Sequence, residues 1–261
     1  MRENKIKSVW SAGGTAVNGW LQIPSAFSAE IMAYQGFDSL TVDMQHGLIG
    51  YETAVQMLQA ISTTETVPFV RVPWNDPAIV MKMLDAGAYG IICPMTNTRQ
   101  ETEKFVRACQ YFPQGNRSFG PIRASFYGGT DYATHANATV AVMPMIETRE
   151  ALDNIDEILS VPGIDGVYVG PADLSLTLGC KPTVDQTDPR VLDALGTILA
   201  ACKRHGVVAG LHNASSSYAA EMAERGWQFV TLASDSRYLA ARAAEELAAV
   251  KTSVASLVPT Y

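Results

Sequence analysis

The sequence predicts an α/β protein that folds as a single (β/α)8 barrel. Short apolar runs rich in β-branched residues alternate with segments of helical periodicity, eight such pairs can be counted, and the chain has 261 residues. This alternation is typical of parallel strands joined by crossover helices, and barrels of this kind often hold about 250 residues in one domain. We therefore expect residues 1–261 to form one barrel domain.

The expected strands are short, apolar and bounded by turn-forming residues. They cover residues 19–23, 39–43, 67–72, 89–94, 141–146, 166–169, 207–211 and 229–233. The helical segments cover residues 25–34, 51–63, 76–86, 98–109, 149–159, 189–204, 215–225 and 236–249. Eight such units in a row predict a closed sheet ringed by helices.

Two segments do not follow the alternation. Residues 111–139 are rich in Gly, Pro and aromatic side chains and contain Arg117, Arg123 and His135. A stretch of this length without periodicity predicts a functional or mobile loop. Residues 251–261 carry several apolar side chains, so we expect this tail either to fray or to pack on a neighbouring subunit.

Composition excludes several classes of protein. The net charge of -7 argues against a broad surface for nucleic acid or anionic membranes. No run approaches the roughly 18–20 apolar residues of a membrane helix, and no signal core follows the N-terminus, so we expect a cytoplasmic protein. The four cysteines are widely spaced without a CxxC pair, which favours free thiols.

Polar residues gather where the predicted strands end. Asp43 and His46 follow the second strand, Arg71 ends the third, Glu147 follows the fifth and Asp173 lies just after the sixth. Active sites of (β/α)8 barrels are built at this end of the strands. We therefore expect two carboxylates, a histidine and an arginine to converge on one barrel mouth.

Glu147 and Asp173 form the candidate metal site, because two carboxylates from different strand ends suit a hard cation such as Mg²⁺ or Mn²⁺. Such an ion would stabilise the enolate of a 2-oxo acid that fills its open positions. The alternative is structural: Glu147 would favour the dipole of the helix that follows it, and Asp173 would be an N-cap.

Arg71 and the turn before Asp173 are candidate anion-binding groups. Gly170, Pro171 and Ala172 open a helix whose backbone N–H groups could hold a substrate carboxylate, although a plain strand-to-helix turn explains the same residues. An arginine pointing into a barrel mouth needs an anionic partner or water, so Arg71 could hold a keto oxygen.

His46 is the candidate general base. It lies three residues after Asp43, whose carboxylate could orient the imidazole through one ring nitrogen while the other handles a proton. A lone histidine is more often structural, and the preference for His46 rests on its place at the mouth. A Schiff-base aldolase would need a lysine inside the barrel. Predicted helices or loops instead contain Lys82, Lys104, Lys181, Lys203 and Lys251.

The chain resembles the HpcH/HpaI aldolases, which are class II pyruvate aldolases with a barrel of the phosphoenolpyruvate/pyruvate-domain type. The resemblance runs from Gly19-Trp20-Leu21 to residues 234–237. Its most specific segments are Val42-Asp43-Met44-Gln45-His46-Gly47, Val70-Arg71-Val72-Pro73-Trp74-Asn75-Asp76, Ile146-Glu147-Thr148-Arg149-Glu150-Ala151 and Gly166-Val167-Tyr168-Val169-Gly170-Pro171-Ala172-Asp173-Leu174-Ser175.

The resemblance implies an enzyme that joins or cleaves pyruvate, or hydroxypyruvate, and an aldehyde through an enolate stabilised by Mg²⁺, Mn²⁺ or Co²⁺. Glu147 and Asp173 would bind the metal and Arg71 the pyruvyl oxygen, and His46 with Asp43 would serve proton transfer, with a metal-bound water as another candidate base. The turn 170–173 and Trp20 would contact substrate. The resemblance further implies that Asp85 reaches the histidine of an adjacent subunit in a hexamer built from two trimers.

Two positions depart from the family pattern: Met145 stands where a glutamine is common, and Gln45 where an acidic residue is common. Both bear on which donor or aldehyde fits. Two other functions stay open, namely an acyl-CoA lyase or thioesterase similar to citrate lyase β-subunits, and a non-catalytic barrel that binds a 2-oxo acid. The first would require a basic cluster at the mouth, which only Arg117 and Arg123 could supply.

Overall fold

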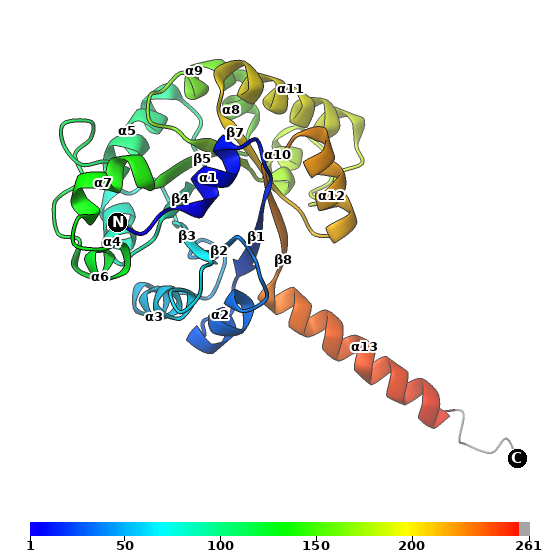
Figure 1. The fold of residues 1–261 in the computed structure, drawn as a ribbon. Coiled ribbons are helices and arrows are strands. Elements are labelled where there is room, and N and C mark those ends of the chain that lie inside the picture. Colours follow the sequence, from blue (N-terminus) through cyan, green and yellow to red (C-terminus); the bar gives the residue numbers. More distant parts are fainter. Residues whose placement is uncertain (256–261) are drawn as a thin grey trace, which may run out of the picture.

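The protein is a closed barrel of eight parallel strands in sequential order, which confirms the predicted fold (Figure 1). We describe the computed structural model for residues 1–255, with side-chain surroundings for residues 1–251. The strands are β1 (Ala16–Leu21), β2 (Ser39–Asp43), β3 (Val67–Arg71), β4 (Gly90–Cys93), β5 (Ala141–Ile146), β6 (Gly166–Val169), β7 (Val208–His212) and β8 (Phe229–Ser234).

The helices that alternate with the strands occupy the segments predicted for them. They are α2 (Ala26–Ala33), α3 (Tyr51–Ile61), α4 (Pro77–Asp85), α5 (Arg99–Cys109), α8 (Arg149–Asp153), α9 (Ile155–Leu159), α11 (Pro189–His205), α12 (Ser216–Arg225) and α13 (Asp235–Ala255). Three helices were not predicted from the sequence, namely α1 (Lys5–Ser11), α6 (Ile122–Gly128) and α7 (Tyr132–Thr139). A fourth, α10 (Pro171–Thr177), was not predicted as a separate segment.

Local sequence signals fix where several of these helices begin and end. Thr98 and Glu101 form a capping box at the start of α5, in which each side chain bonds the backbone of the other. Asp76 caps α4, and Pro77 occupies its first turn. Gly206 ends α11 in the left-handed conformation that glycine adopts without strain. Each strand is thereby joined to its crossover helix at a defined residue.

Apolar side chains fill both the barrel interior and the layer between strands and helices. Phe69, Met143 and Phe229 belong to the interior cluster and are fully buried. A Cβ atom at Gly90 would lie 2.1 Å from the Phe69 ring, so the large residue on β3 requires glycine on β4. Helix α1 covers the amino-terminal end of the barrel, where the Trp10 indole packs edge-on to Phe229 at 5.6 Å.

Residues 111–139 are not the long loop that the sequence predicts. They fold into α6 and α7, and their cations point inward. Arg117 is 5% exposed and lies over the Tyr111 ring at 4.3 Å. Arg123 donates to the Ala86 carbonyl and to Ser62 Oγ. The prediction was wrong because these helices pack through aromatic and cationic side chains, which give no periodic apolar signal in the sequence.

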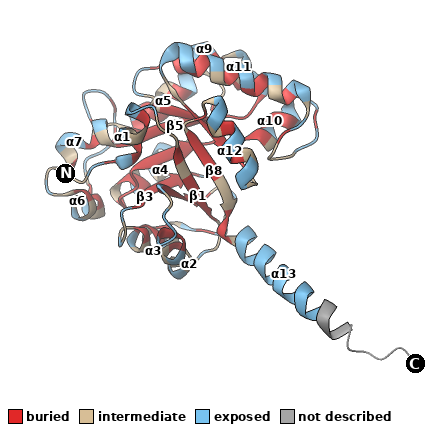
Figure 2. Cartoon of the chain, turned by 45° about the vertical axis from the view of Figure 1, so that its right-hand side comes forward, coloured by how far each residue is buried: buried red, intermediate tan, exposed pale blue. Residues whose placement is uncertain are grey.

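Helix α13 leaves the barrel instead of lying against it, as Figure 1 shows at its lower right. Its residues from Arg237 to Lys251 are exposed, including Leu239, Leu247 and Val250, and the helix is pale blue in Figure 2. The predicted packing of the tail 251–261 falls largely on residues 256–261, which lie outside the described part of the chain.

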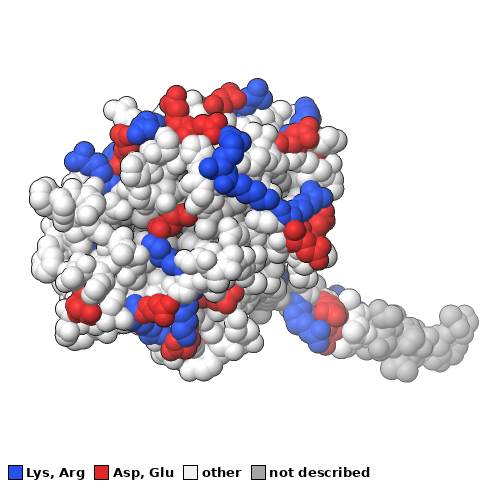
Figure 3. All heavy atoms as spheres, turned by 45° about the horizontal axis from the view of Figure 1, so that its top comes forward, with Lys and Arg blue, Asp and Glu red and all other residues white. Residues whose placement is uncertain are grey.

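Charge is distributed without segregation on the face drawn in Figure 3, where Lys and Arg side chains lie among Asp and Glu side chains. Several ion pairs join side chains one helical turn apart, such as Arg99 with Glu103 and Arg225 with Glu221. Within residues 1–255, none of the helices is both long and apolar enough to span a bilayer.

Candidate active site at the barrel mouth

The carboxyl ends of the strands bring most of the predicted site residues to one cavity of about 170 Å³. Because all eight strands run in the same direction, the residues that end them face a common mouth. The cavity is lined by Trp20, His46, Arg71, Glu147, Gly170, Pro171, Ala172 and Asp173, together with Gln22, Met145, Tyr168, Val184 and His212.

A buried ion pair forms the floor of this mouth. Strands β2 and β3 place Asp43 directly beside Arg71, and the guanidinium donates from Nε to Oδ1 at 2.9 Å and from Nη2 to Oδ2 at 2.7 Å. The Trp20 indole N–H donates to Oδ2 at 3.0 Å, and its ring lies 4.8 Å from the Arg71 guanidinium carbon. Bidentate pairing and aromatic stacking together hold Arg71 in one orientation.

The Asp43 carboxyl stays ionised in this setting. Burial raises its pKa, but hydrogen bonds and charge from Arg71 and a hydrogen bond from Trp20 outweigh burial and leave the pKa below its ordinary value. The Arg71 cation is therefore neutralised within the floor, while its Nη1 group makes no hydrogen bond to a described protein atom and is free to bind a ligand.

Asp43 does not orient the His46 imidazole, so that part of the sequence prediction is wrong. Asp43 Oδ1 accepts from the backbone amides of Gln45 at 3.1 Å and His46 at 3.2 Å, and its remaining capacity is taken by Arg71 and Trp20. The carboxylate thus shapes the loop after β2. The His46 side chain is exposed at the rim of the cavity, with its ring free to reach a ligand or a neighbouring subunit.

Glu147 is a buried carboxyl that faces the cavity. It is 2% exposed, and its Oε1 accepts from the Met95 amide at 2.7 Å. Met95 follows β4 and has a positive φ of 51°, an uncommon conformation for a residue with a side chain. In this conformation its backbone amide donates the hydrogen bond to Glu147. Burial raises the Glu147 pKa to about 7, and the Asp173 charge adds to that rise.

The turn after β6 holds Asp173 near Glu147. A Cβ atom at Gly170 would lie 2.6 Å from Glu147 Oε2 and 3.2 Å from Glu147 Cβ, so a side chain there would displace this carboxyl from its position. Pro171 then opens α10, and Asp173 lies in its first turn. The amides of Ala172 and Asp173 belong to the first turn of α10, where backbone N–H groups have no partner within the helix.

Two carboxylates that face one cavity fit a divalent cation, because an ion would offset the burial and the repulsion from Asp173 that together raise the pKa of Glu147. No cluster of three or more His, Cys, Asp and Glu side chains is placed to hold a metal within residues 1–255. Any cation bound between Glu147 and Asp173 would therefore need ligands from substrate and water as well.

Asp85 lies apart from the mouth of its own chain. It ends α4, and its Oδ1 accepts from Arg117 Nη2 at 2.7 Å. Burial raises the Asp85 pKa, although the paired Arg117 opposes that rise. Within one chain this residue anchors the segment that contains α6 and α7, and it does not line the cavity of Arg71 and Glu147.

Tyr168 and His212 are site residues that were not predicted from the sequence. Tyr168 is fully buried, donates to Thr231 Oγ1 at 2.6 Å, and lies 2.9 Å from Nδ1 of His212. The His212 ring packs edge-on to Trp20 at 4.8 Å and lines the cavity. Its position at the end of β7 was the available signal, because that is the same position from which Arg71 was selected on β3.

A second cavity, of about 110 Å³, adjoins the first and shares Trp20, Gln22, Val184 and His212 with it. Its far side is lined by Ser234 at the end of β8 and by Arg237 at the start of α13. The two departures noted in the sequence lie nearby: Met145 lines the first cavity, and Gln45 Oε1 is buried without a hydrogen-bond partner.

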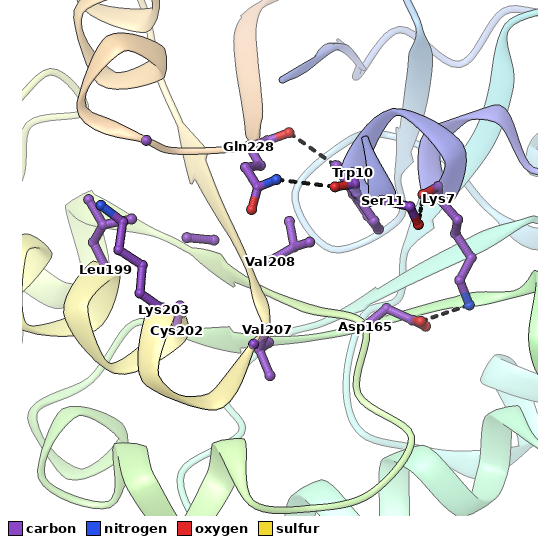
Figure 4. Close-up of a pocket in the computed structure, with 13 residues that line it drawn as sticks. Lys7, Trp10, Ser11, Asp165, Leu199, Cys202, Lys203, Val207, Val208 and Gln228 are labelled. Atoms are coloured by element: carbon purple, nitrogen blue, oxygen red, sulfur yellow. Dashed lines mark hydrogen bonds and ion pairs between the residues drawn. The ribbon is translucent and has the colours of Figure 1, made fainter. Parts of the chain in front are cut away.

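A larger cavity of about 420 Å³ lies at the opposite end of the barrel, beside α1 (Figure 4). Several of its polar groups are paired within the protein: Lys7 pairs with Asp165 at 2.7 Å, and the Trp10 indole donates to the Gln228 carbonyl. The amino-terminal ends of barrel strands serve stability, so this cavity is not the candidate site despite its volume.

Comparisons with known proteins agree with this site. The chain is 45% identical over 245 residues to a hydroxypyruvate/pyruvate aldolase of Rhizorhabdus wittichii, covering 94% of this chain and 98% of that protein. It is 38% identical over 250 residues to a 4-hydroxy-2-oxo-heptane-1,7-dioate aldolase of Shigella flexneri, covering 95% and 92%. A Burkholderia cenocepacia structure of an HpcH/HpaI aldolase/citrate lyase family protein aligns with a TM-score of 0.89 at 31% identity, covering 95% and 99%.

The barrel, its mouth and these relatives define an aldolase, a carbon–carbon lyase. The chain belongs to the HpcH/HpaI aldolase/citrate lyase family, whose model matches residues 18–241. The family and the enzyme class predicted from the sequence are thus confirmed, and the relatives do not favour the acyl-CoA alternative.

Burial of Glu147 has a consequence for stability. Its pKa rises from 4.5 to about 7 on folding, so the folded protein holds a proton there that the unfolded chain releases between those pH values. Ionising the buried carboxyl opposes folding at higher pH. We expect Glu147→Gln to raise the free energy of unfolding of metal-free protein by about 1–3 kcal/mol at pH 8, and by under about 1 kcal/mol at pH 5.

Urea denaturation in EDTA at the two pH values measures this difference. Glu150→Gln on the exposed start of α8 is the matched control, and we expect it to change stability by less than about 0.5 kcal/mol at either pH. A Glu147→Gln protein no more stable than the wild type at pH 8 would contradict the raised pKa.

Proposed function

We propose that this aldolase is a class II enzyme that uses a divalent metal ion held by Glu147 and Asp173, joining a pyruvate-like 2-oxo acid to an aldehyde and cleaving the resulting 4-hydroxy-2-oxo acid. The observation that carries the proposal is the buried Glu147 carboxyl, which faces one cavity with Asp173 and Arg71 and has its pKa raised to about 7. When bound, Mg²⁺, Mn²⁺ or Co²⁺ would supply Lewis-acid stabilisation of the enolate.

Arg71 would bind the keto oxygen. Its Nε and Nη2 groups are committed to Asp43, so its orientation is fixed before substrate arrives, and Nη1 is the remaining nitrogen for a ligand. A donor fixed in this way stabilises developing negative charge without reorganising during the reaction. The paired Asp43 makes this possible, because an unpaired buried guanidinium would be costly.

The turn from Gly170 to Asp173 would bind the substrate carboxylate. The first-turn amides of α10, at Ala172 and Asp173, have no acceptor within the helix, and they lie in the wall of the same cavity. Trp20 would form an apolar side of the substrate pocket, held in place by its hydrogen bond to Asp43.

His46 would carry the proton between the methyl carbon of the 2-oxo acid and solvent. Its ring is exposed at the rim of the cavity that holds the other groups. The C–H electron pair becomes the enolate double bond, and in the forward reaction this carbon then bonds to the aldehyde carbon, whose oxygen takes a proton. Cleavage follows the same steps in reverse.

The relatives' names frame the choice of substrate. One is named for hydroxypyruvate and pyruvate and the other for 4-hydroxy-2-oxo-heptane-1,7-dioate, and both substrate types have the 2-oxo acid group that this site would bind. The acyl-CoA alternative would require a basic cluster at the mouth, supplied by Arg117 and Arg123. Arg117 is instead buried against Asp85, and Arg123 donates to Ala86 and Ser62.

Proton exchange tests the proposed half-reaction without knowledge of the aldehyde. We expect the methyl signal of pyruvate to disappear from the proton NMR spectrum when the enzyme is incubated with Mg²⁺ in D₂O, because the enolate forms reversibly. EDTA should stop the exchange, and Mg²⁺, Mn²⁺ or Co²⁺ should restore it. Exchange that persists after metal stripping would refute the metal role, and no exchange with any of the three ions would refute enolisation.

Two alanine variants separate the roles of His46 and Glu147. We expect His46→Ala to lower turnover by about 100-fold or more while metal affinity stays within about 3-fold, because a proton carrier is lost and the ion site is kept. Glu147→Ala should weaken both turnover and metal binding, measured by steady-state assay and calorimetric titration. His135→Ala, on the exposed side of α7, is the control. Identical behaviour of the two site variants would contradict these roles.

We also propose that the enzyme is a homohexamer built from two trimers, in which Asp85 contacts His46 of an adjacent subunit. Supporting this proposal, α13 leaves its own barrel with apolar side chains exposed, and His46 and Asp85 line no common cavity within one chain. A cytoplasmic location is proposed from the four free cysteines, all of which are buried.

Subunit mixing tests the shared site. His46→Ala and Asp85→Asn proteins should each be nearly inactive, and unfolding and refolding them together should restore activity, because a mixed interface can pair an intact His46 with an intact Asp85. Asparagine keeps the acceptor for Arg117. Light scattering gives the assembly size. Mixtures no more active than the separate variants would rule out a contribution of Asp85 across subunits.

A further inference from the structure

His212 stands on the wall shared by the two cavities at the barrel mouth and has no role in the proposed reaction. One edge of its ring is fixed, because Nδ1 lies 2.9 Å from the Tyr168 hydroxyl, and the ring makes a T-shaped contact with Trp20. The ring nitrogen left for a ligand is Nε2, which makes no hydrogen bond to any described residue. A histidine held in this way presents one defined polar atom to the cavities.

The hydrogen bonds behind the ring determine which nitrogen carries the proton. The Tyr168 hydroxyl donates its hydrogen to Thr231 Oγ1 at 2.6 Å. Tyr168 can then only accept from His212, so Nδ1 is the protonated nitrogen. Asn18 Nδ2 also donates to Thr231 Oγ1, and Asn18 Oδ1 accepts from Ser39 and Thr41, so this network reaches across the barrel interior. Nε2 is left with a lone pair that faces the cavities.

The lone pair persists at neutral pH. Burial, together with the positive charges of Arg71 and Arg237, lowers the His212 pKa to about 4 against the opposing charges of Asp43 and Asp185. At His212 the effect of Arg71 exceeds that of its partner Asp43, and the effect of Arg237 exceeds that of Asp185, so the net influence of these charges disfavours a ligand with an ammonium group. A ligand that donates to Nε2 is therefore neutral at the donating atom, which points to a hydroxyl group.

Several other side-chain acceptors near the second cavity are already used. The Gln22 amide oxygen accepts from Ser236, and Ser234 Oγ accepts from the Arg237 amide. The Asp43 carboxylate is occupied by Arg71 and Trp20. Nε2 of His212 is thus a neutral acceptor at this wall that no described residue uses, while the guanidinium of Arg237 supplies donors on the far side.

We propose that His212 is a specificity-determining residue that accepts a hydrogen bond from a hydroxyl group of the substrate through Nε2. This inference rests on the proposed aldol function and adds a substrate class to it. The hydroxyl could belong to the 2-oxo acid, as in hydroxypyruvate, or to a hydroxylated aldehyde. Both are the same chemistry at Nε2, because each supplies an uncharged O–H donor.

Substrate pairs that differ by one hydroxyl test the proposal. Rates of aldol addition are measured for hydroxypyruvate against pyruvate with one aldehyde, and for glycolaldehyde against acetaldehyde with pyruvate. His212→Phe keeps an aromatic ring against Trp20 but removes the acceptor. We expect it to lower the ratio of kcat/KM values, hydroxylated over deoxygenated, by about 5- to 10-fold in at least one pair. His212→Gln, whose amide oxygen can accept, should restore part of the ratio.

The outcomes identify the source of the hydroxyl. A fall confined to the first pair assigns it to the 2-oxo acid, and a fall confined to the second pair assigns it to the aldehyde. Unchanged ratios in both pairs, in a variant with wild-type thermal stability, would overturn the proposal. His135→Phe, outside the site, should leave both ratios unchanged.

Failure of the underlying function would look different. Wild-type enzyme that forms no aldol product from any pair and does not exchange the pyruvate methyl protons would refute the proposed aldol reaction itself. Wild-type enzyme that is active, together with a His212→Phe variant that shows the same substrate ratios, would refute only the role of His212.

Discussion

The buried pair of Asp43 and Arg71 is the interaction on which the barrel mouth depends. Adjacent strands bring a carboxylate and a guanidinium to the same level, where neither is stable alone. Asp43 then also accepts from Trp20 on β1 and from two amides of the loop after β2. One carboxylate therefore connects three strands and a loop, and removing it would leave a desolvated cation and an unsatisfied indole together.

The other carboxyl, Glu147, lies in the opposite electrostatic condition. Asp43 is surrounded by donors and stays ionised, whereas Glu147 has one amide partner, a negatively charged neighbour and little contact with solvent. Two acidic groups in one mouth thus have pKa values displaced in opposite directions, as acid–base sites require. Asp43, whose pKa is lowered, stabilises the structure of the mouth. Glu147, whose pKa is raised, would be stabilised in its ionised form by a bound cation.

Much of the fold could be predicted from the sequence because strand and helix periods alternate eight times. Residues that end strands were also identifiable, since the carboxyl end of a parallel barrel is a defined place, and Arg71, Glu147 and Asp173 were selected on that basis. The partner of Asp43 was missed because register between neighbouring strands, which sets it beside Arg71, is a tertiary property. His212 was missed although it ends β7, because the hydrogen bond that fixes its ring comes from Tyr168 on β6, a contact that only the folded chain shows.

The absence of a side chain at residue 170 matters as much as any functional group at the mouth. The space that a methyl group would fill there belongs to the Glu147 carboxylate. A substitution there would thus alter the mouth without changing any reactive group, since even alanine would displace the acid from the turn. Attempts to broaden the range of accepted molecules are better begun at Val184, which borders both hollows and whose aliphatic side chain makes no hydrogen bonds that a replacement would have to reproduce.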